Sequence, residues 1–382
     1  MIEVKTNQQQ NIRLLAVKAL SEINRNGAYA NIKLQEYLQK YHLSDLDRRF
    51  FTELVYGVIR RKNYLDAIIV LFAKRPIKKL SSMVVEILRL GIYQIIYMDK
   101  VPESAAVNES VKLAKKLTRG LSGFVNAVLR SVLRESDSIS IGELAKSEAE
   151  EISFIYNQPL WLVNLWIKEM GKDKTVDLCS WFNEQPRLTA RINTVKVSIE
   201  DCLKELEDLD WIVEQDTYIP EVVYIDGHQG HLEKAKPVLE GHITFMDKAS
   251  MLVAHVVDPQ PGELILDCCA APGGKSMHMA SLMNNTGAIM SCDIYDHKLE
   301  LINQNAERLG VSIISTKLQD GRYLPDNWKE QFDRVLVDAP CSGLGILQKK
   351  LDMRWRKTES LLIELPPLQL EILEKASEMV KV

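Results

Sequence analysis

Four short apolar segments in the last third of the chain each end in acidic or cysteine residues. They cover residues 263–269, 288–293, 312–320 and 333–340, and helical patterns begin at Lys275 and run from Asp296 to Leu309. Strands that alternate with helices are typical of a parallel α/β sheet. Because the carboxyl ends of parallel strands lie at one edge, we expect the residues that follow these strands to gather there.

The first two thirds of the chain predict two other kinds of structure. Apolar residues recur at helical spacing from Gln10 to about Glu135, which indicates an all-α bundle of six or seven helices, with Ser44 as an N-cap. Residues 136–155 are polar and acidic and are expected to form a connector, and a helical region begins at Trp161. Short strand-like runs surround one helix in residues 187–247, as in a small α+β module.

The predicted fold class is therefore multidomain. It combines a helical bundle, a small α+β module and a partial Rossmann-like α/β sheet, with domains at residues 1–135, 136–250 and 251–382.

Charge is distributed unevenly between the two ends of the chain. Residues 1–134 hold 23 Lys and Arg against 11 Asp and Glu, whereas the remainder holds 25 against 41. A basic domain favours a polyanionic partner such as a nucleic acid, and docking onto the acidic part of the chain is the alternative. Clusters of basic residues are also typical of solvated helix faces. The basic residues that cluster here are Arg48, Arg49, Arg60, Arg61, Lys62, Lys74, Arg75, Lys78, Lys79, Lys112, Lys115, Lys116 and Arg119.

Several classes of protein are disfavoured. No window offers about 18 uncharged apolar residues, and the N-terminus lacks an apolar signal region, so we expect a cytoplasmic protein without a membrane span. The cysteines, which form no C-x-x-C pair, are expected to be reduced. His228 and His231 have ligand-like spacing but no Cys or carboxylate partners at matching spacing, so no metal is expected. Nothing indicates an oligomer, and we expect a monomer.

A turn of small residues follows the first of the four strands. Ala270-Ala271-Pro272-Gly273-Gly274-Lys275 leads into a helix, so the backbone and the helix N–H groups can approach a ligand. The Rossmann pattern G-x-G-x-x-G is not met. The P-loop pattern is nearly met but has Cys269 at its first glycine position, which disfavours an ATPase or kinase.

The other three strands end in candidate binding or catalytic residues. Asp293 is placed to bind ribose hydroxyls, and Asp320 to reach an adenine amino group. Asp338 precedes Pro340 and Cys341, where loop amides could lower a thiol pKa. Each carboxylate could instead be a helix N-cap, and Cys341 a buried core residue. The remaining scattered cysteines are expected to be structural: Cys179, Cys202 and Cys292.

These segments together resemble the S-adenosylmethionine-dependent RNA cytosine-C5 methyltransferases. The resemblance rests on DCCAAPGGK at 267–275, Asp293, Asp320-Gly321 and DAPCSG at 338–343. The helical N-terminus resembles a NusB-type RNA-binding domain, and this pairing resembles the bacterial Sun-type (RsmB) 16S ribosomal RNA methyltransferases. Further segments extend the match over nearly the whole chain: Arg191, Asn193, Lys196, residues 245–251 with Met246 in place of the usual Gln, residues 349–355, Leu368 and Gln369.

The resemblance implies a role for each matching residue. S-adenosylmethionine would be the cofactor, and 16S ribosomal RNA the partner. Asp293 would bind the ribose, Asp320 the adenine, and Asp338 would line the pocket between the methyl donor and the target base. The methionine end of the cofactor would be held by Cys269, Ala270, Ala271, Pro272, Gly273, Gly274 and Lys275.

The expected chemistry is addition of a thiolate to C6 of an unstacked cytosine, after which C5 attacks the methyl group. In the family the attacking thiol lies in a Thr-Cys segment on a fifth strand, and the Pro-Cys cysteine assists product release. This chain contains no Thr-Cys pair and stops at Val382, so it is expected to be C-terminally incomplete, with the strand at 333–340 at the edge of its sheet. Cys341 is then the releasing group or a substitute nucleophile, and a non-catalytic RNA-binding protein is the alternative function.

Overall fold

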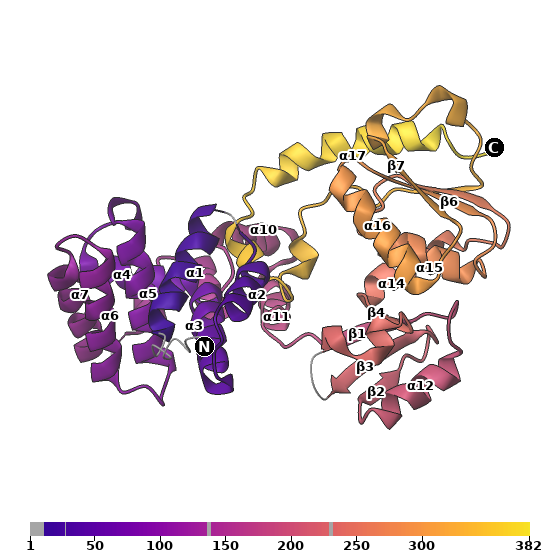
Figure 1. The fold of residues 1–382 in the computed structure, drawn as a ribbon. Coiled ribbons are helices and arrows are strands. Elements are labelled where there is room, and N and C mark those ends of the chain that lie inside the picture. Colours follow the sequence, from indigo (N-terminus) through magenta and orange to yellow (C-terminus); the bar gives the residue numbers. More distant parts are fainter. Residues whose placement is uncertain (1–10, 27, 136–138, 229–231) are drawn as a thin grey trace. The chain divides into compact units, whose positions relative to one another are not determined.

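The computed structural model describes residues 11–26, 28–135, 139–228 and 232–382. It divides into two compact units (Figure 1). The helical unit comprises residues 1–185 and 343–359, and the α/β unit comprises residues 186–342 and 360–382. Among the described residues, no helix is long and apolar enough to cross a membrane.

Seven α-helices occupy the described part of residues 1–135, which confirms the predicted helical bundle. The apolar positions of the first helix, such as Leu15 and Leu20, are buried in the shared core. Ser44 caps a helix as predicted, because its hydroxyl accepts a hydrogen bond from the backbone N–H of Asp47 at 3.2 Å. The helices are α1 (Ile12–Asn26), α2 (Ala30–Lys40), α3 (Asp45–Arg60), α4 (Lys62–Ala73), α5 (Ser82–Tyr97), α6 (Glu103–Leu117) and α7 (Ser122–Glu135), with the 3-10 turn η1 (Ile77–Lys79).

The prediction of a connector at residues 136–155 is wrong over most of its length. Residues 136–138 lie outside the described residues, and α8 (Ile141–Leu144) and α9 (Glu148–Tyr156) follow them. The acidic residues that suggested a linker lie in the first turn of α9, where they interact favourably with the helix dipole. The helical region predicted from Trp161 is confirmed by α10 (Leu160–Met170) and α11 (Lys172–Trp181).

The segment 343–359 belongs to the helical unit although it follows the α/β sheet in sequence. It contains the 3-10 turns η6 (Leu344–Ile346) and η7 (Leu351–Trp355). The indole N–H of Trp355 donates to the carbonyl of Ile59 at 2.6 Å. The Arg354 side chain is buried among backbone carbonyls of residues 157 and 182. Contacts with residues more than 150 positions away in the sequence thus hold this segment in place.

The predicted small α+β module is present in the α/β unit. Its four strands form an antiparallel sheet of order β2-β3-β1-β4. The helix predicted between the first two strands is α12, which begins after the N-cap Ser198. The elements are β1 (Leu188–Ile192), α12 (Ile199–Asp208), β2 (Ile212–Gln215), β3 (Val222–Gly227), η3 (Leu232–Lys234), α13 (Lys236–Leu239) and β4 (Ile243–Phe245).

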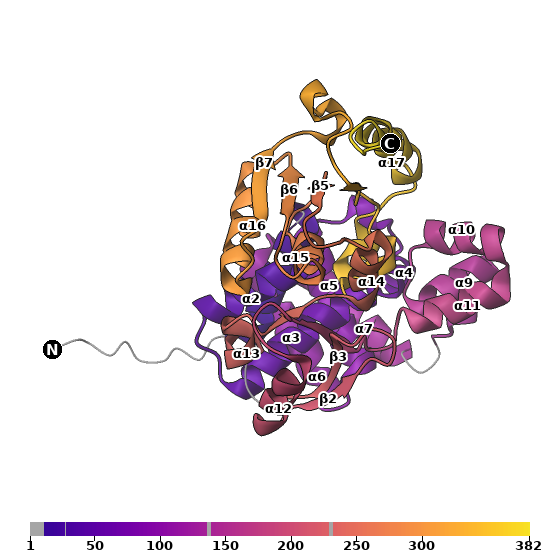
Figure 2. The same cartoon turned by 90° about the vertical axis from the view of Figure 1, so that its right-hand side faces the viewer.

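The predicted parallel sheet is also present, with strand order β7-β6-β5-β8. Its strands pair in parallel throughout. Figure 2 views this sheet with its helices around it. The elements are α14 (Lys248–Val257), β5 (Leu264–Asp267), α15 (Gly274–Leu282), β6 (Ala288–Asp293), α16 (Asp296–Leu309), β7 (Ile314–Leu318), η4 (Gly321–Tyr323), η5 (Asp326–Trp328), β8 (Arg334–Leu336) and α17 (Leu361–Ser377).

The two faces of the parallel sheet are covered by different helices. Ile265 of β5 packs with residues of α14, α15 and α16 on one face. The next residue, Leu266, packs with Ala376 of α17 on the other face, because successive side chains of a strand point to opposite sides. β8 is the outermost named strand, as expected, and Val380 forms a parallel bridge with Phe332 just before it.

Candidate functional site

The carboxyl ends of the four parallel strands bring the predicted acidic residues to one edge of the sheet. Asp267 ends β5 and Asp293 ends β6, whereas Asp320 and Asp338 each follow the last residue of their strand, β7 and β8, by two positions. Because all neighbouring strands run in parallel, these four residues lie at the same edge. The sheet topology therefore agrees with the gathering of residues expected from the sequence.

The turn between β5 and α15 exposes backbone rather than side chains. Gly273 has a φ of +99°, which residues with a Cβ rarely adopt, and it caps α15. The turn is tied to the sheet because the Ala270 N–H donates to the carbonyl of Cys292 at 2.8 Å. The first amides of α15 begin at Gly274, so this end of the helix suits an electron-rich group.

Asp267 is a buried carboxylic acid behind this turn. Its side chain accepts a hydrogen bond from the Ser276 hydroxyl at 2.7 Å, and Ser276 in turn accepts one from Ser291 at 2.9 Å. Burial raises the pKa of Asp267 to about 6. Its buried Oδ1 atom has no hydrogen-bond partner among the described residues, although the backbone N–H of Cys269 acts on this carboxyl and opposes the rise of its pKa.

The electrostatics of Cys269 show how closely the acidic residues surround the turn. Burial raises the pKa of the Cys269 thiol to about 12, and the carboxylates of Asp267, Asp293, Asp338 and Asp320 all add to that rise. A thiol with such a pKa stays protonated at neutral pH. Cys269 is therefore suited to lining a binding site and unsuited to nucleophilic attack.

The two carboxylates expected to hold a nucleoside have different local partners. Asp293 is buried, accepts a hydrogen bond from the Tyr295 N–H at 3.1 Å, and lies 3.5 Å from the ammonium group of Lys298. Asp320 caps η4 and pairs with Arg322 at 2.7 Å, which lowers the pKa of Asp320. The alternative that Asp320 is an N-cap is thus realised in the structure, and an adenine amino group would have to share this carboxylate with Arg322.

The loop after β8 meets the loop after β5. The ammonium group of Lys275 forms an ion pair with the carboxylate of Asp338. The carbonyl of Pro340 accepts a hydrogen bond from the Gln369 side chain at 2.8 Å, so α17 supports the loop that carries Cys341. Cys341 is exposed, in contrast to the alternative of a buried core residue. All six cysteines are free, as predicted, and Cys179, Cys202 and Cys292 are buried.

The residues of the R-x-N segment join the small α+β module to the parallel sheet. The Asn193 amide donates to the carbonyls of Gly241 and Leu309, both at 2.8 Å. The Lys196 ammonium group donates to the carbonyl of Arg308 at 2.7 Å. Arg191 is fully buried. These residues hold the two parts of the α/β unit together.

The basic clusters of the helical unit are only partly available to a partner. Lys62 is half-buried, and the loss of solvent around its ammonium group lowers its pKa. Arg61 lies 3.9 Å from the centre of the Tyr97 ring. A hollow of about 570 Å³ lies at the end of α4 and combines basic and apolar groups. It is lined by Val70, Lys74, Arg75, Pro76, Ile77 and Lys78.

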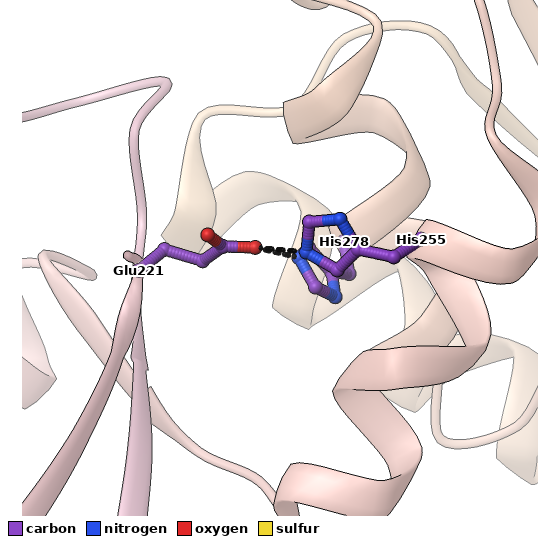
Figure 3. Close-up of side chains that lie close together, drawn as sticks. All are labelled: Glu221, His255 and His278. Carbon is purple, nitrogen blue, oxygen red and sulfur yellow. Dashed lines mark hydrogen bonds and ion pairs between the residues drawn. The ribbon is translucent and has the colours of Figure 1, made fainter. Parts of the chain in front are cut away.

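One cluster of side chains was not found from the sequence. Glu221, His255 and His278 converge in the α/β unit (Figure 3). They are separated by 34 and 23 residues in sequence, so no ligand-like spacing could have revealed them. Of the two histidines with ligand-like spacing, His231 lies outside the described residues.

The fold and this edge of the sheet define a class of protein. The first strand of the parallel sheet leads through a glycine turn into a helix, and acidic residues follow the other strands. This arrangement is that of a Rossmann-like methyltransferase domain. Residues 254–382 match the family described as 16S rRNA methyltransferase RsmB/F. Residues 10–134 match the NusB family, and residues 158–230 match the ferredoxin-like domain of RsmF/B-like methyltransferases.

Known proteins identify the family. The chain is 35% identical over 376 residues to the probable ribosomal RNA small subunit methyltransferase B of Bacillus subtilis, covering 98% of this chain and 83% of that protein. It is 38% identical over 382 residues to the corresponding protein of Synechocystis, covering 97% and 83%. The chain belongs to the family of ribosomal RNA small subunit methyltransferases B.

Solved structures share the fold of this chain. A crystal structure of the protein PH0851 matches with a TM-score of 0.80 at 25% identity, covering 97% of this chain and 84% of that one. The crystal structure of NSun6 from Pyrococcus horikoshii with SFG matches with a TM-score of 0.52 at 20% identity, covering 57% and 79%, and supports the fold alone.

Proposed function

We propose that the protein transfers the methyl group of S-adenosylmethionine to C5 of a cytosine in 16S ribosomal RNA. The observation that carries this proposal is the ion pair between Lys275 and Asp338. It joins the turn suited to the cofactor with the loop that presents Cys341. Methyl donor and target base would have to meet at such a junction.

The residues at the sheet edge fit S-adenosylmethionine. Gly273 lets the backbone approach a ligand closely, since a Cβ there would be strained by its φ of +99° and would lie 3.3 Å from the Met277 methyl carbon. The unpartnered Oδ1 atom of Asp267 offers one acceptor. In this proposal, residues 269–275 hold the methionine end, Asp293 the ribose and Asp320 the adenine, and the bound cofactor supplies an electrophilic methyl group.

We assign Cys341 to the side of the target base. The proposed reaction adds a cysteine thiolate to C6 of the cytosine, which makes C5 nucleophilic toward the methyl group. C5 would then form a bond to the methyl group as the sulfur–methyl bond of the donor breaks, which leaves S-adenosylhomocysteine. A base would remove the C5 proton, and the thiolate would leave C6. Cys341 adds to C6 or assists this last step, and Asp338 lies three residues away on the same loop.

The RNA partner is assigned to the helical unit. The chain belongs to a family of ribosomal RNA methyltransferases, and residues 10–134 match the NusB family. The hollow lined by Lys74, Arg75 and Lys78 offers cations for phosphate groups beside apolar surface. These contacts to the RNA phosphates would offset the free energy needed to unstack the cytosine and move it into the site.

The first test is methyl transfer by the 382-residue chain from radiolabelled S-adenosylmethionine to 16S ribosomal RNA that lacks modifications. We expect label at C5 of cytosine and its loss in Cys341→Ala. Cys202→Ala, which changes a buried cysteine of α12, should keep the activity. Undiminished transfer by Cys341→Ala would contradict the assigned role.

Trapping on RNA that contains 5-fluorocytidine separates the two roles of Cys341. If Cys341 is the nucleophile, the covalent complex disappears in Cys341→Ala. If the complex persists or accumulates in Cys341→Ala, another thiol forms the adduct and Cys341 assists release. Binding of both the cofactor and RNA without any methyl transfer would support the alternative of a non-catalytic RNA-binding protein.

The assignment of RNA to the helical unit is tested by charge removal. We expect the triple variant Lys74→Gln, Arg75→Gln, Lys78→Gln to weaken RNA binding and to reduce the slope of log affinity against log salt by up to about 3. A matched variant neutralises three lysines of α10 and α11 in the same unit: Lys168, Lys172 and Lys174. Equal losses in both variants would show that the hollow is not the binding surface.

A further inference from the structure

Three side chains from three separate elements meet inside the α/β unit (Figure 3). Glu221 immediately precedes β3, His255 lies on α14, and His278 lies on α15. One carboxylate oxygen, Oε1 of Glu221, lies 2.6 Å from Nε2 of His255 and 2.8 Å from Nε2 of His278. Both imidazole rings therefore direct the same ring nitrogen at one point.

Two imidazole nitrogens and one carboxylate oxygen form a ligand set typical of zinc and related transition metals. The three donor atoms all lie within 4.8 Å of one another. Around a tetrahedral ion, donor atoms at bond lengths of 2.0–2.2 Å are about 3.4 Å apart. The Glu221 oxygen, now 2.6 and 2.8 Å from the two imidazole nitrogens, would thus have to move away from each of them by roughly 0.7 Å.

Burial differs across the cluster in a way that leaves a route for an ion. The side chains of His278 and Glu221 are 1% and 9% exposed, whereas that of His255 is 35% exposed. The two buried ligands are held by the packing around them. His255 has room to move outward, and a fourth ligand can reach the ion from its side.

Arg191 sets a limit on which ion fits. Its guanidinium group is fully buried, has no hydrogen-bond partner among the described residues, and acts electrostatically on both Glu221 and His278. This positive charge opposes ions held mainly by electrostatics, such as magnesium or calcium. It favours an anionic fourth ligand, such as hydroxide or chloride, on an ion that bonds strongly to imidazole.

We propose that Glu221, His255 and His278 bind one divalent transition-metal ion of the zinc type, with an anion as the fourth ligand. The bound ion would link β3 of the small α+β module to α14 and α15. His278 lies three residues after Lys275 on α15, so the ion would stiffen the helix that begins at the proposed cofactor turn. The proposal does not depend on the proposed methyl transfer.

A second cluster in the same unit provides the control. Glu205, Glu240 and His242 also place donor atoms within 4.8 Å of one another, but only one of them is an imidazole. The ammonium group of Lys236 lies 3.9 Å from both of these carboxylates and already offsets part of their charge. We expect no zinc-type ion there.

The experiment is a titration of metal-free, tag-free protein with Zn²⁺ and, separately, with Co²⁺. Because the exposed thiol of Cys341 could also bind these ions, all proteins carry Cys341→Ser. We expect one equivalent of tightly bound Zn²⁺ by mass spectrometry of metals, and a visible Co²⁺ spectrum typical of tetrahedral coordination. Zn²⁺ should also raise the melting temperature.

Two substitutions decide the assignment. His255→Asn changes the most exposed ligand, and we expect it to weaken Zn²⁺ binding by more than the 10- to 100-fold typical of losing an outer-shell partner. His242→Asn, in the control cluster, should bind Zn²⁺ like the parent protein. The proposal is overturned if the parent binds no stoichiometric Zn²⁺, or if His255→Asn binds it as tightly as His242→Asn does. Glu221→Gln should repeat the effect of His255→Asn if His255→Asn proves poorly folded.

Discussion

Each unit of this molecule buries one arginine completely, and the two arginines are treated in opposite ways. Arg354 lies in the helical unit and Arg191 in the α/β unit, and burial lowers the pKa of each to about 10. Arg354 donates hydrogen bonds to four acceptors, at 2.6–3.3 Å. The three guanidinium nitrogens of Arg191 have no partner among the described residues.

The difference separates a structural role from a functional one. A buried charge is costly unless hydrogen bonds compensate it. Protein acceptors take up four of the five N–H groups of Arg354, so its presence is explained by the fold of the segment 343–359. Arg191 has no hydrogen-bond acceptor among the described residues, and only the nearby carboxylate of Glu221 stabilises its charge. Its N–H groups are therefore open to an acceptor from outside the chain, such as water or an anion.

The largest effect is expected for Arg354→Met. The change removes four hydrogen bonds at once, each worth about 1 kcal/mol or more, so the helical unit should lose about 4 kcal/mol of unfolding free energy. Urea denaturation gives the total, and hydrogen exchange measured by mass spectrometry assigns it to residues 343–359 and their neighbours. The exposed Arg130→Met in α7 is the control. If Arg354→Met loses no more unfolding free energy than the control, Arg354 does not have the structural role assigned to it.

The hydrogen bonding of Asp267 is intermediate between that of the two arginines. One of its carboxylate oxygens accepts a hydrogen bond and the other does not. Its pKa is raised from 3.8 to about 6, so the folded protein holds a proton that the unfolded chain releases. The stability that this proton confers is complete below about pH 4 and is lost as pH rises through 6, by up to about 3 kcal/mol. Asp267→Asn should lack this loss.

The measurement is unfolding free energy between pH 4 and pH 7 for both proteins. The advantage of the parent over Asp267→Asn should fall by about 3 kcal/mol across this range. Other titrating groups affect both proteins equally and cancel in the difference. A constant difference would mean that Asp267 is hydrated and titrates normally.

Features that depend on local sequence could be predicted. The helix from Asp296 to Leu309, the N-cap at Ser44 and the presence of the four strands follow from periodicity, capping chemistry and alternation of strands with helices. Of the strand ends only that of β6 agrees with the sequence; the other three strands end two to four residues earlier than expected. The acidic residues at the sheet edge followed in turn, because parallel strands share one carboxyl edge.

Features that depend on distant partners could not be predicted. Arg354 contacts residues about 170 and 200 positions away, so nothing near it in the sequence marks it as buried. Glu221, His255 and His278 come together only because the small α+β module packs against α14 and α15. The acidic start of α9 predicts a connector from composition alone, because acidic residues are common both in the first turn of a helix and in linkers.

Arg191→Met tests the opposite side of the comparison. Replacing an uncompensated buried charge by an apolar side chain of similar volume is often neutral or stabilising, so we expect a change between zero and a gain of about 2 kcal/mol. Denaturation under the same conditions as for Arg354→Met makes the two directly comparable. A loss as large as that of Arg354→Met would show that Arg191 has firm acceptors, and the contrast would fail.

Ser44→Ala gives the scale of an ordinary, exposed hydrogen bond in the helical unit. Its hydroxyl satisfies one N–H at the start of α3, so removal should cost about 1 kcal/mol. Hydrogen exchange should then increase at the first turn of α3 while residues 343–359 keep their protection. If Ser44→Ala and Arg354→Met lower the unfolding free energy equally, the hydrogen bonds of the buried guanidinium contribute no more than one exposed hydrogen bond. The lack of hydrogen-bond partners around Arg191 would then be no argument for a ligand. A clear excess for Arg354→Met would instead strengthen the inference that a buried guanidinium without partners is retained for a ligand.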